Sequence, residues 1–311
     1  MSSEYPGIVI VGPTASGKTQ LGIALASRFR GEIVSCDALQ VYRQMDIGTG
    51  KVSAAEQMLV RHHMLDLQDP DKDFSAGDYQ RLAREVLARI REREHIPFVV
   101  GGTGFYLRAL IDGLFVGPSR SEALRARMRR IIQRRGVRTL HRALNRVDPQ
   151  SASRIALSDA ERIIRAYEVY LLSGKPMTRW QQQPRDALRG CRWLKVGIQM
   201  PRALLYQRIE QRVEEMFRSG FLEEVQKLLA GFPRDSHAFR AIGYKQIADY
   251  LEGKCSVSQA MDETKKESRH YAKRQLTWFR SDPEIQWLDG QLNLDQLRIS
   301  AAALIEEFLG G

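Results

Sequence analysis

The chain lacks the features that mark secreted and membrane proteins. Its 311 residues include only three cysteines, which lie far apart and form no CxxC pair (Cys36, Cys191 and Cys255). We therefore expect reduced thiols, because disulfide frameworks and cysteine metal sites need closer or more numerous cysteines. No apolar run is long enough to cross a membrane, and the stretch from Met1 to Pro6 lacks the basic and apolar regions of a signal peptide. These absences predict a cytoplasmic protein without a membrane-spanning part.

Acidic residues are in the minority. The 48 Lys and Arg exceed the 37 Asp and Glu by 11, and many of the arginines cluster. An excess of this size predicts a polyanionic partner larger than one diphosphate, although a basic surface that only keeps the protein soluble explains it equally well. With 43% hydrophobic residues, the chain can bury the core of one large domain with an elaboration.

A glycine-rich loop follows the apolar run 8–11. It reads GPTASGKT and consists of Gly12, Pro13, Thr14, Ala15, Ser16, Gly17, Lys18 and Thr19. The loop matches the pattern G-x-x-x-x-G-K-[ST], and apolar residues at helical spacing follow it, as this motif requires. Backbone N–H groups of such a loop, at the positive end of a helix, bind linked phosphates. Lys18 then supplies a cation and the Thr19 hydroxyl a ligand for Mg²⁺, but the motif does not say whose phosphates bind.

Strands and helices alternate along much of the chain. Short apolar runs predict further strands at 32–35, 96–100, 193–198 and 284–288. The alternation predicts an α/β fold in which helices flank a parallel P-loop sheet. Ligands of such sheets bind beyond the carboxyl ends of the strands, so the glycine-rich loop, Asp37 and Thr103 should converge on one crevice.

Residues 118–189 differ in character from the rest. Strand-like runs vanish there, arginines crowd together and helical spacing dominates. We therefore expect an inserted, basic, all-helical subdomain at 118–189, within an α/β core made of 1–117 and 190–311.

The sequence lacks the acidic residue that normally ends a buried strand in ATPases with this loop. The predicted strand 96–100 runs into Gly101, Gly102 and Thr103, where an NTPase of this class normally has an acidic residue that helps to hold Mg²⁺. A hydroxyl and flexible backbone suit hydrogen bonding to a phosphate or a base better than metal-assisted ATP hydrolysis. A small-molecule or nucleoside kinase remains the alternative that the loop alone allows.

Several other polar residues are candidates for chemistry. Asp37 follows the second predicted strand, so its carboxylate either takes a proton from a nucleophile or belongs to a solvated turn. Asp46 and Asp66 are weaker candidates. His62 and His63 favour a structural role over a metal site, because adjacent side chains of an extended segment point in opposite directions.

Basic residues at helical or turn positions have two interpretations each. Arg208 and Arg212 lie four apart on a predicted helix and either close over a diphosphate or form a salt-bridged surface. Arg162 and Arg165 are RNA contacts or a solvated stripe. The segment 239–245 interleaves basic and aromatic residues around a glycine, which suits either stacking on an unpaired base or packing in a turn.

Taken together, these residues resemble one family, the tRNA dimethylallyltransferases (isopentenyl-diphosphate:tRNA transferases). The resemblance runs from about Ile8 to Leu288, and kinases share only its first segment. The segments, in the order typical of the family, are GPTASGKT at 12–19, the SxD…QVYRxMDIGTxK pattern at 35–51, RHHMLDL at 61–67, FSAGDY at 74–79, VVGGTGFYLRAL at 99–110, RAIGYKQ at 240–246 and YAKRQLTWFR at 271–280. Ala38 stands where many members have Ser. No cysteine/histidine zinc-finger segment follows Leu288, so the chain resembles the bacterial type.

The resemblance implies transfer of a dimethylallyl group from dimethylallyl diphosphate to N6 of the adenosine 3′ to the anticodon in tRNA, flipped out of its stack. It implies Asp37 as the general base, Thr103 at the junction of the two substrates, and Arg212 with Arg208 as cations over the diphosphate. The loop residues, with Mg²⁺ at Thr19, would stabilise the leaving diphosphate. The implied tRNA contacts are Asp37, Ala38, Leu39, Gln40, Thr103, Arg125, Glu161, Arg162, Ile163, Ile164, Arg165, Arg240, Ala241, Ile242, Gly243, Tyr244 and Lys245.

The partners implied are thus dimethylallyl diphosphate and the anticodon arm of a tRNA, which the helical subdomain would grip. Nothing in the sequence demands more than a monomer. A non-catalytic RNA-binding module that uses the basic insert is the second alternative.

Overall fold

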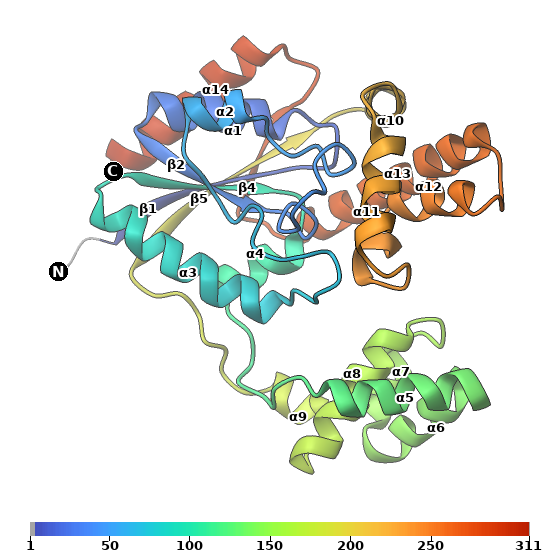
Figure 1. Cartoon of the computed structure of the whole chain (residues 1–311). Helices are drawn as coiled ribbons and strands as arrows, with labels where there is room; N and C mark the ends of the chain where they lie inside the picture. Colours follow the sequence, from blue (N-terminus) through green and yellow to red (C-terminus); the bar gives the residue numbers. More distant parts are fainter. Residues whose placement is uncertain (1–3, 311) are drawn as a thin grey trace. The chain divides into compact units, whose positions relative to one another are not determined.

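The computed structural model describes residues 4–310 and divides into two compact units (Figure 1). We call them the core unit, which runs up to Ile111 and from Leu188 onward, and the helical unit, Asp112–Ala187. Residues 1–3 lie outside the described part, and with them the beginning of the N-terminal stretch discussed above. The helical unit begins at residue 112, six residues before the expected start at 118. It ends at residue 187, two residues before the expected end at 189. The reason is local pairing, since Phe115 forms an antiparallel bridge with Arg185 inside the helical unit.

The core unit contains a six-stranded sheet in the order β3-β2-β4-β1-β5-β6, in which every neighbouring pair is parallel. The α/β parallel fold predicted from the alternation is therefore confirmed, and the last predicted strand lies at the sheet edge. The strands are β1 (Tyr5–Val11), β2 (Gly31–Cys36), β3 (His62–His63), β4 (Ile96–Gly101), β5 (Cys191–Gln199) and β6 (Ile285–Asp289).

Helices cover both faces of this sheet because its central strands are apolar on both sides. Ile8 and Ile10 of β1 belong to one hydrophobic cluster, and Val9 and Val11 belong to another. In Figure 1, α1 (Lys18–Arg28), α2 (Ala54–Leu59) and α14 (Leu294–Gly310) lie on one face, and α3 (Ala76–Glu92) and α4 (Gly104–Ile111) lie on the other.

A further group of helices gathers at one end of the sheet (Figure 1). They are α10 (Arg202–Arg218), α11 (Phe221–Gly231), α12 (Tyr244–Leu251) and α13 (Val257–Phe279), with a short 3₁₀ turn η1 (His237–Arg240). The cavity residues described below come from this group and from the ends of β1, β2 and β4, so the group stands at the carboxyl ends of the strands, where ligands of such sheets bind.

The helical unit contains five helices in the part of the chain that is described. They are α5 (Glu122–Arg135), α6 (Val137–Val147), α7 (Pro149–Arg154), α8 (Ala160–Ser173) and α9 (Met177–Gln181). Met128, Leu140, Leu144, Ile163 and Ile164 form its own small core. Across residues 4–310, no helix combines the length and the apolar character needed to span a bilayer.

Candidate active site

The glycine-rich loop connects β1 to α1 and has the backbone of an anion-binding nest. Ala15 and Gly17 adopt left-handed conformations, with φ of 62° and 88°. Left-handed residues that alternate with others turn successive N–H groups toward one concave side. The side-chain oxygen of Gln275 accepts a hydrogen bond from the Thr14 amide at 2.8 Å. The loop is therefore tied to α13 as well as to its own strand and helix.

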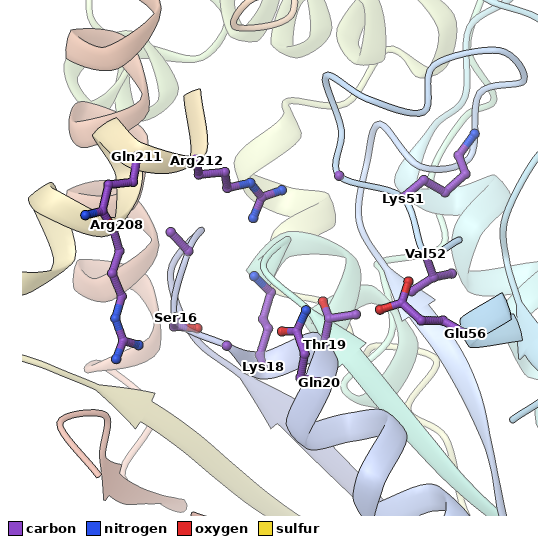
Figure 2. Close-up of a pocket in the computed structure, with 13 residues that line it drawn as sticks. Ser16, Lys18, Thr19, Gln20, Lys51, Val52, Glu56, Arg208, Gln211 and Arg212 are labelled. Carbon is purple, nitrogen blue, oxygen red and sulfur yellow. The ribbon is translucent and has the colours of Figure 1, made fainter. Parts of the chain in front are cut away.

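A cavity of about 410 Å³ opens beside this loop (Figure 2). Lys18 and Thr19 line it from one side, and Arg208 and Arg212 line it from α10. Figure 2 shows the Lys18 ammonium and the Arg212 guanidinium pointing into the same space. Gly50, at φ 58°, packs directly against the Arg212 guanidinium, so a side chain at position 50 would displace it.

Lys18 and Arg212 are buried close to each other, and the negative charge of Asp37 does not fully offset the cost of burying them. Burial and, to a lesser extent, the positive charge of Arg212 lower the pKa of Lys18 to about 8, against the opposing effect of Asp37. Burial likewise lowers the pKa of Arg212, which Asp37 again opposes. A bound anion would stabilise the charged forms of both groups. The cavity is thus built for a negatively charged ligand.

A second cavity, of about 370 Å³, adjoins the first. Both are lined by Lys18, Thr19, Gly50 and Arg212, so these residues stand where the two spaces meet. The second cavity is also lined by Asp37, Ala38, Leu39, Gln40, Arg240, Ala241, Ile242, Tyr271, Arg274 and Gln275. Its α10 and α11 side is apolar, with Ile209, Val213, Met216 and Phe221. One wall can therefore hold an apolar group next to the phosphate loop while a carboxylate stands on another.

The Asp37 carboxylate is held by the turn that follows β2. Its Oδ1 accepts the amide of Leu39 at 2.9 Å, and the Thr103 hydroxyl accepts the amide of Ala38 at 3.0 Å. The Tyr271 side chain lies next to Thr103. The Thr103 hydroxyl therefore fixes the backbone that carries Asp37.

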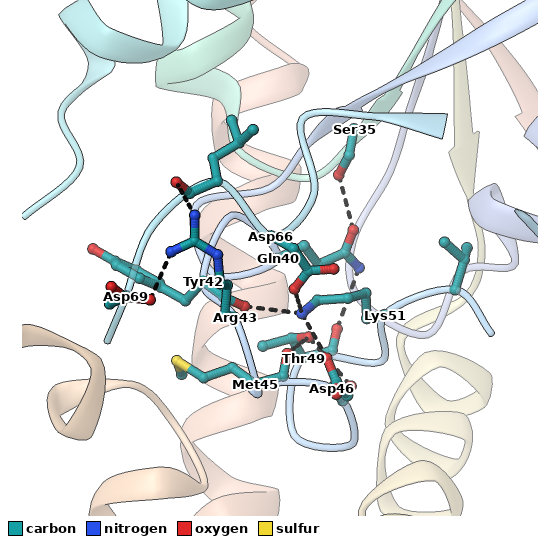
Figure 3. A network of polar contacts seen from close by, with 12 residues as sticks. Ser35, Gln40, Tyr42, Arg43, Met45, Asp46, Thr49, Lys51, Asp66 and Asp69 are labelled. Carbon is teal, nitrogen blue, oxygen red and sulfur yellow. Dashed lines mark hydrogen bonds and ion pairs between the residues drawn. The ribbon is translucent and has the colours of Figure 1, made fainter. Parts of the chain in front are cut away.

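A polar network supports the segment between Asp37 and α2 (Figure 3). The Gln40 side chain accepts from the Ser35 hydroxyl at 2.8 Å and donates to the Gly50 carbonyl at 3.3 Å. Arg212 donates to the neighbouring Thr49 carbonyl at 3.4 Å. This chain of contacts links the end of β2 to the cation of α10, so the Gln40 side chain is engaged within the protein.

The weaker acidic candidates have structural partners. The buried ammonium of Lys51 lies 2.6 Å from a carboxylate oxygen of Asp46 and 2.6 Å from one of Asp66 (Figure 3). It also donates to the Tyr42 carbonyl at 2.9 Å. Asp46 and Asp66 thus neutralise a buried lysine that closes the loop between β2 and α2.

The two histidines also have structural surroundings. His63 lies 2.6 Å from the buried carboxylate of Glu32, which Arg93 and His95 also contact. His62 bonds its own segment through the Val60 carbonyl. Across the described residues, no cluster of three or more His, Cys, Asp or Glu could hold a metal ion. The structural interpretation of this histidine pair is the one that the geometry supports.

The donor set fits Mg²⁺ only as a companion of a phosphate ligand. Thr19 offers one hydroxyl beside the loop, and Glu56 is the acidic residue that lines the first cavity. Mg²⁺ keeps several waters and is commonly held by one or two protein groups together with substrate phosphates. The site is therefore compatible with Mg²⁺ that arrives with a diphosphate.

The implied RNA contacts in the core unit divide into two groups. Arg240, Ala241 and Ile242 line the second cavity and Lys245 is exposed, so all four are accessible to a ligand. Tyr244 is fully buried, and its hydroxyl donates to a Glu224 carboxylate oxygen at 2.6 Å. Phe239 and Gly243 are buried too, and Gly243 forms a turn at φ 87°. For these three residues, packing in a turn is correct and base stacking is not.

The implied contacts in the helical unit require a similar correction. Ile163 and Ile164 lie in the core of this unit, at 0% and 1% exposure, so their side chains cannot contact a ligand. Arg125 is also buried, with its Nε 3.1 Å from an oxygen of Glu168, which is 0% exposed. Arg165 donates to the same carboxylate at 2.8 Å and remains partly exposed. Glu161 and Arg162 are exposed.

One face of α13 contributes to the site and was not among the residues predicted from the sequence. Tyr271, Arg274 and Gln275 all line the second cavity, and Gln275 also donates to the Gly102 carbonyl at 2.9 Å. The spacing of three and four residues within the YAKRQ segment was the available signal, because such residues share one helix face.

The fold and these two cavities define a class, a P-loop α/β protein whose phosphate loop faces a carboxylate across a partly apolar space. A family model described as IPP transferase matches residues 40–282, more than half of the chain. The chain belongs to this IPP transferase family.

Named relatives agree with this assignment. The chain is 51% identical over 282 residues to a tRNA dimethylallyltransferase of Koribacter versatilis, covering 91% of this chain and 92% of that protein. It is 45% identical over 284 residues to the tRNA dimethylallyltransferase of Geobacillus thermodenitrificans, covering 91% and 90%.

Solved structures agree as well. A tRNA isopentenylpyrophosphate transferase from Bacillus halodurans matches with a TM-score of 0.73 and 39% identity, over 98% of this chain and 96% of that one. A eukaryotic dimethylallyltransferase acting on tRNA matches with a TM-score of 0.78 and 26% identity, over 97% and 78%. The recognition of the family from its motifs is thereby confirmed, and none of these matches supports the kinase alternative.

Proposed function

We propose that this protein transfers a dimethylallyl group from dimethylallyl diphosphate to N6 of the adenosine 3′ to the anticodon in tRNA. The observation that supports this most is the shared boundary of the two cavities, where Lys18 and Thr19 of the phosphate loop and Arg212 of α10 line both the space beside the loop and the space that Asp37 lines. The names of the relatives support a tRNA and a dimethylallyl donor as substrates, and the geometry supports a role for each wall of the two cavities.

In the proposed reaction, N6 of an everted adenosine attacks C1 of the dimethylallyl group. A C–N bond forms, the C–O bond to diphosphate breaks, and the N6 proton passes to the Asp37 carboxylate. Negative charge grows on the departing diphosphate. The loop amides, Lys18 and Arg212 would stabilise that charge, with Arg208 supporting from the same helix. Thr103 acts here mainly by holding the backbone beside Asp37.

Bound Mg²⁺, held by the Thr19 hydroxyl and the diphosphate, would neutralise part of the leaving-group charge. The apolar side chains of α10 and α11 would accommodate the isoprenoid and exclude water from C1, which favours attack by nitrogen over hydrolysis.

The tRNA would be held by residues of both units. In the core unit, Arg240 to Ile242 line the cavity that the adenosine would enter. In the helical unit, exposed arginines such as Arg162 would contact phosphates, while Arg125 would act by positioning. A tRNA substrate accords with the cytoplasmic location expected from the sequence.

The test is transfer of labelled dimethylallyl groups to unmodified tRNAs that carry adenosine at this position. We expect label in the tRNA and release of diphosphate. Lys18→Ala should lower both pyrophosphate affinity and transfer by about ten- to a hundredfold, because a charge-assisted contact is lost. Lys254→Ala, an exposed lysine of the core unit, is the control. Absence of transfer with several such tRNAs, while the protein is folded and binds pyrophosphate, contradicts the proposal.

A further inference from the structure

An exposed aromatic patch continues the wall of the second cavity. Tyr271, Arg274 and Gln275 line that cavity from α13. Trp278 follows on the same face of the helix, one turn beyond them, because residues three and four apart lie above one another. Its ring packs against Gly104, the residue after Thr103, and any side chain at position 104 would collide with it.

The patch combines two aromatic rings with a guanidinium. Trp278 and Phe105 are 39% and 49% exposed, and their rings meet edge to face with centroids 6.5 Å apart. The Arg108 guanidinium lies 5.1 Å from the Trp278 ring centre. We call Phe105, Arg108 and Trp278 the aromatic patch. Single exposed apolar residues are common, but two adjacent aromatic rings beside a cation, at the margin of a functional cavity, indicate a binding surface.

The chemistry of this surface fits an unpaired nucleotide. Aromatic rings stack on the π-face of any base, and a neighbouring arginine can contact the phosphate. On α13, Arg274 likewise lies 5.7 Å from the Tyr271 ring centre, so the cation and ring pairing extends toward the cavity.

Eversion of one base creates a need for such a surface. A base that leaves the stack removes stacking from its neighbours, which costs a few kcal/mol. An aromatic side chain next to the pocket that receives the everted base can replace part of that lost stacking.

We propose that the aromatic patch stacks on the unpaired base next to the adenosine that enters the second cavity. This inference rests on the proposed function and adds a residue-level determinant of the RNA substrate. The rings of Trp278 and Phe105 are the stacking groups, and the Thr103–Gly104 segment brings them next to the turn that carries Asp37.

The experiment combines protein variants with altered RNA. Transfer would be measured with an anticodon stem–loop and with two copies of it, each abasic at one neighbour of the modified adenosine. We expect Trp278→Ala and Phe105→Ala to raise the KM for the intact RNA about five- to a hundredfold, while pyrophosphate affinity stays unchanged. Trp278→Phe should keep most of the affinity. Ile299→Ala, an apolar residue 68% exposed on α14, is the control and should change nothing.

The decisive result is non-additivity between the two kinds of change. One abasic RNA should raise the KM of the parent protein as much as Trp278→Ala does, and should add nothing further in that variant. Fully additive effects with both abasic RNAs would overturn the stacking role while transfer by the parent protein continues. If the parent transfers no dimethylallyl group to any RNA, the proposed function itself fails. Because Phe105 is half exposed, its variant keeps the test valid if the Trp278 variant is unstable.

Discussion

The two units of this molecule carry very different charge. The helical unit has 16 Arg and Lys against 7 Asp and Glu, a difference of +9, whereas the remainder has 32 against 30, a difference of +2. Nearly the whole basic surplus of the chain therefore belongs to the unit that does not contain the phosphate loop. Fifteen of its 16 basic residues are arginines, whose planar guanidinium matches phosphate oxygens. This difference supports the proposal that most phosphate contacts of the tRNA come from the helical unit, while the core unit binds the diphosphate.

Each unit also contains one buried carboxylate with several basic partners. In the helical unit, Glu168 is held by Arg125, Arg165 and the Ser121 amide. In the core unit, Glu32 is held by Arg93 and by two histidines. Because histidine changes charge near neutral pH and arginine does not, the two clusters should respond differently to acid.

The largest expected effect follows from Asp37→Ala. Loss of a positioned general base should lower kcat about a hundred- to ten-thousandfold. The affinity for tRNA should change much less, because the basic surplus of the helical unit remains. Single-turnover transfer and tRNA binding, measured on the same preparation, check this separation.

Asp46→Ala serves as the acidic control for the Asp37 variant. Asp46 is the more exposed of the two carboxylates that pair with the buried Lys51, and Asp66 remains when Asp46 is lost, so kcat should stay within a few-fold of the parent value. Equal losses of tRNA affinity and turnover in Asp37→Ala would contradict the proposal that the helical unit supplies most of the tRNA affinity while Asp37 acts in the chemical step.

Local patterns were sufficient to predict most of the fold. The parallel strands, the glycine-rich loop and the helix that follows the loop were predicted from apolar runs and periodicity within short windows. Contacts between distant segments could not be predicted in this way. The Thr14 amide meets the Gln275 side chain across 261 residues, and no local signal encodes that pairing.

The burial of Ile163 and Ile164 in the core of the helical unit could not be predicted from the sequence either. Ile163 and Ile164 adjoin arginines, and helical spacing alone does not tell which side of α8 faces α5 and α6. Similarly, the aromatic and basic interleaving around Gly243 does not reveal that Tyr244 meets Glu224. In both cases the deciding partner lies on another element.

The second effect concerns the stability of the helical unit. Arg125→Ala leaves the buried Glu168 carboxylate without its bidentate partner, and removal of one member of a buried pair costs about 3–5 kcal/mol. We expect the helical unit to unfold at lower temperature or denaturant concentration, with tRNA binding lost in parallel. Pyrophosphate binding, a property of the core unit, should survive.

Arg127→Ala is the matched control for this variant. Arg127 is exposed and lies two residues further along α5, so its loss should change the free energy of unfolding by no more than about 0.5 kcal/mol. If Arg125→Ala keeps the parent's unfolding transition and only raises the KM for tRNA, Arg125 contacts the RNA directly. The proposal that it stabilises the helical unit by pairing with Glu168 would then be wrong.

The third effect is an acid sensitivity of the core unit. Burial alone would raise the pKa of Glu32, but hydrogen bonds from Arg93, His63 and His95 lower it to about 2. A folded-state pKa below the ordinary 4.5 contributes stability above pH 4.5, and this contribution is lost as the pH falls toward 2. It amounts to about 3 kcal/mol when fully present. Burial also lowers the pKa of His63 below 6.5, so loss of stability begins as the pH falls through that value.

Unfolding of the core unit, followed through pyrophosphate-dependent thermal shifts between pH 7 and pH 3, checks the acid prediction. Glu32→Gln should be less stable than the parent at pH 7 and should lose the steep dependence below pH 4.5. No histidine contacts Glu168 among its hydrogen bonds and ion pairs in the described chain, so Glu168→Gln should leave the decline between pH 6.5 and 4.5 unchanged. The same decline in a His63→Gln variant would show that the histidine does not contribute.

The smallest effect is the salt dependence of tRNA binding. The Arg162 side chain is 76% exposed on α8 and pairs only with Asp159, 3.1 Å away, among the ion pairs of the described chain. In Arg162→Ala, loss of one phosphate contact should weaken tRNA binding a few-fold and reduce the slope of log K against log salt by roughly 0.7 to 0.9.

Arg81→Ala, which removes an exposed arginine of α3 in the core unit, should leave that slope unchanged. Because a surface ion pair contributes little to folding, Arg162→Ala should unfold like the parent. A reduced slope for Arg81→Ala and an unchanged one for Arg162→Ala would place the phosphate contacts in the core unit and reverse the comparison.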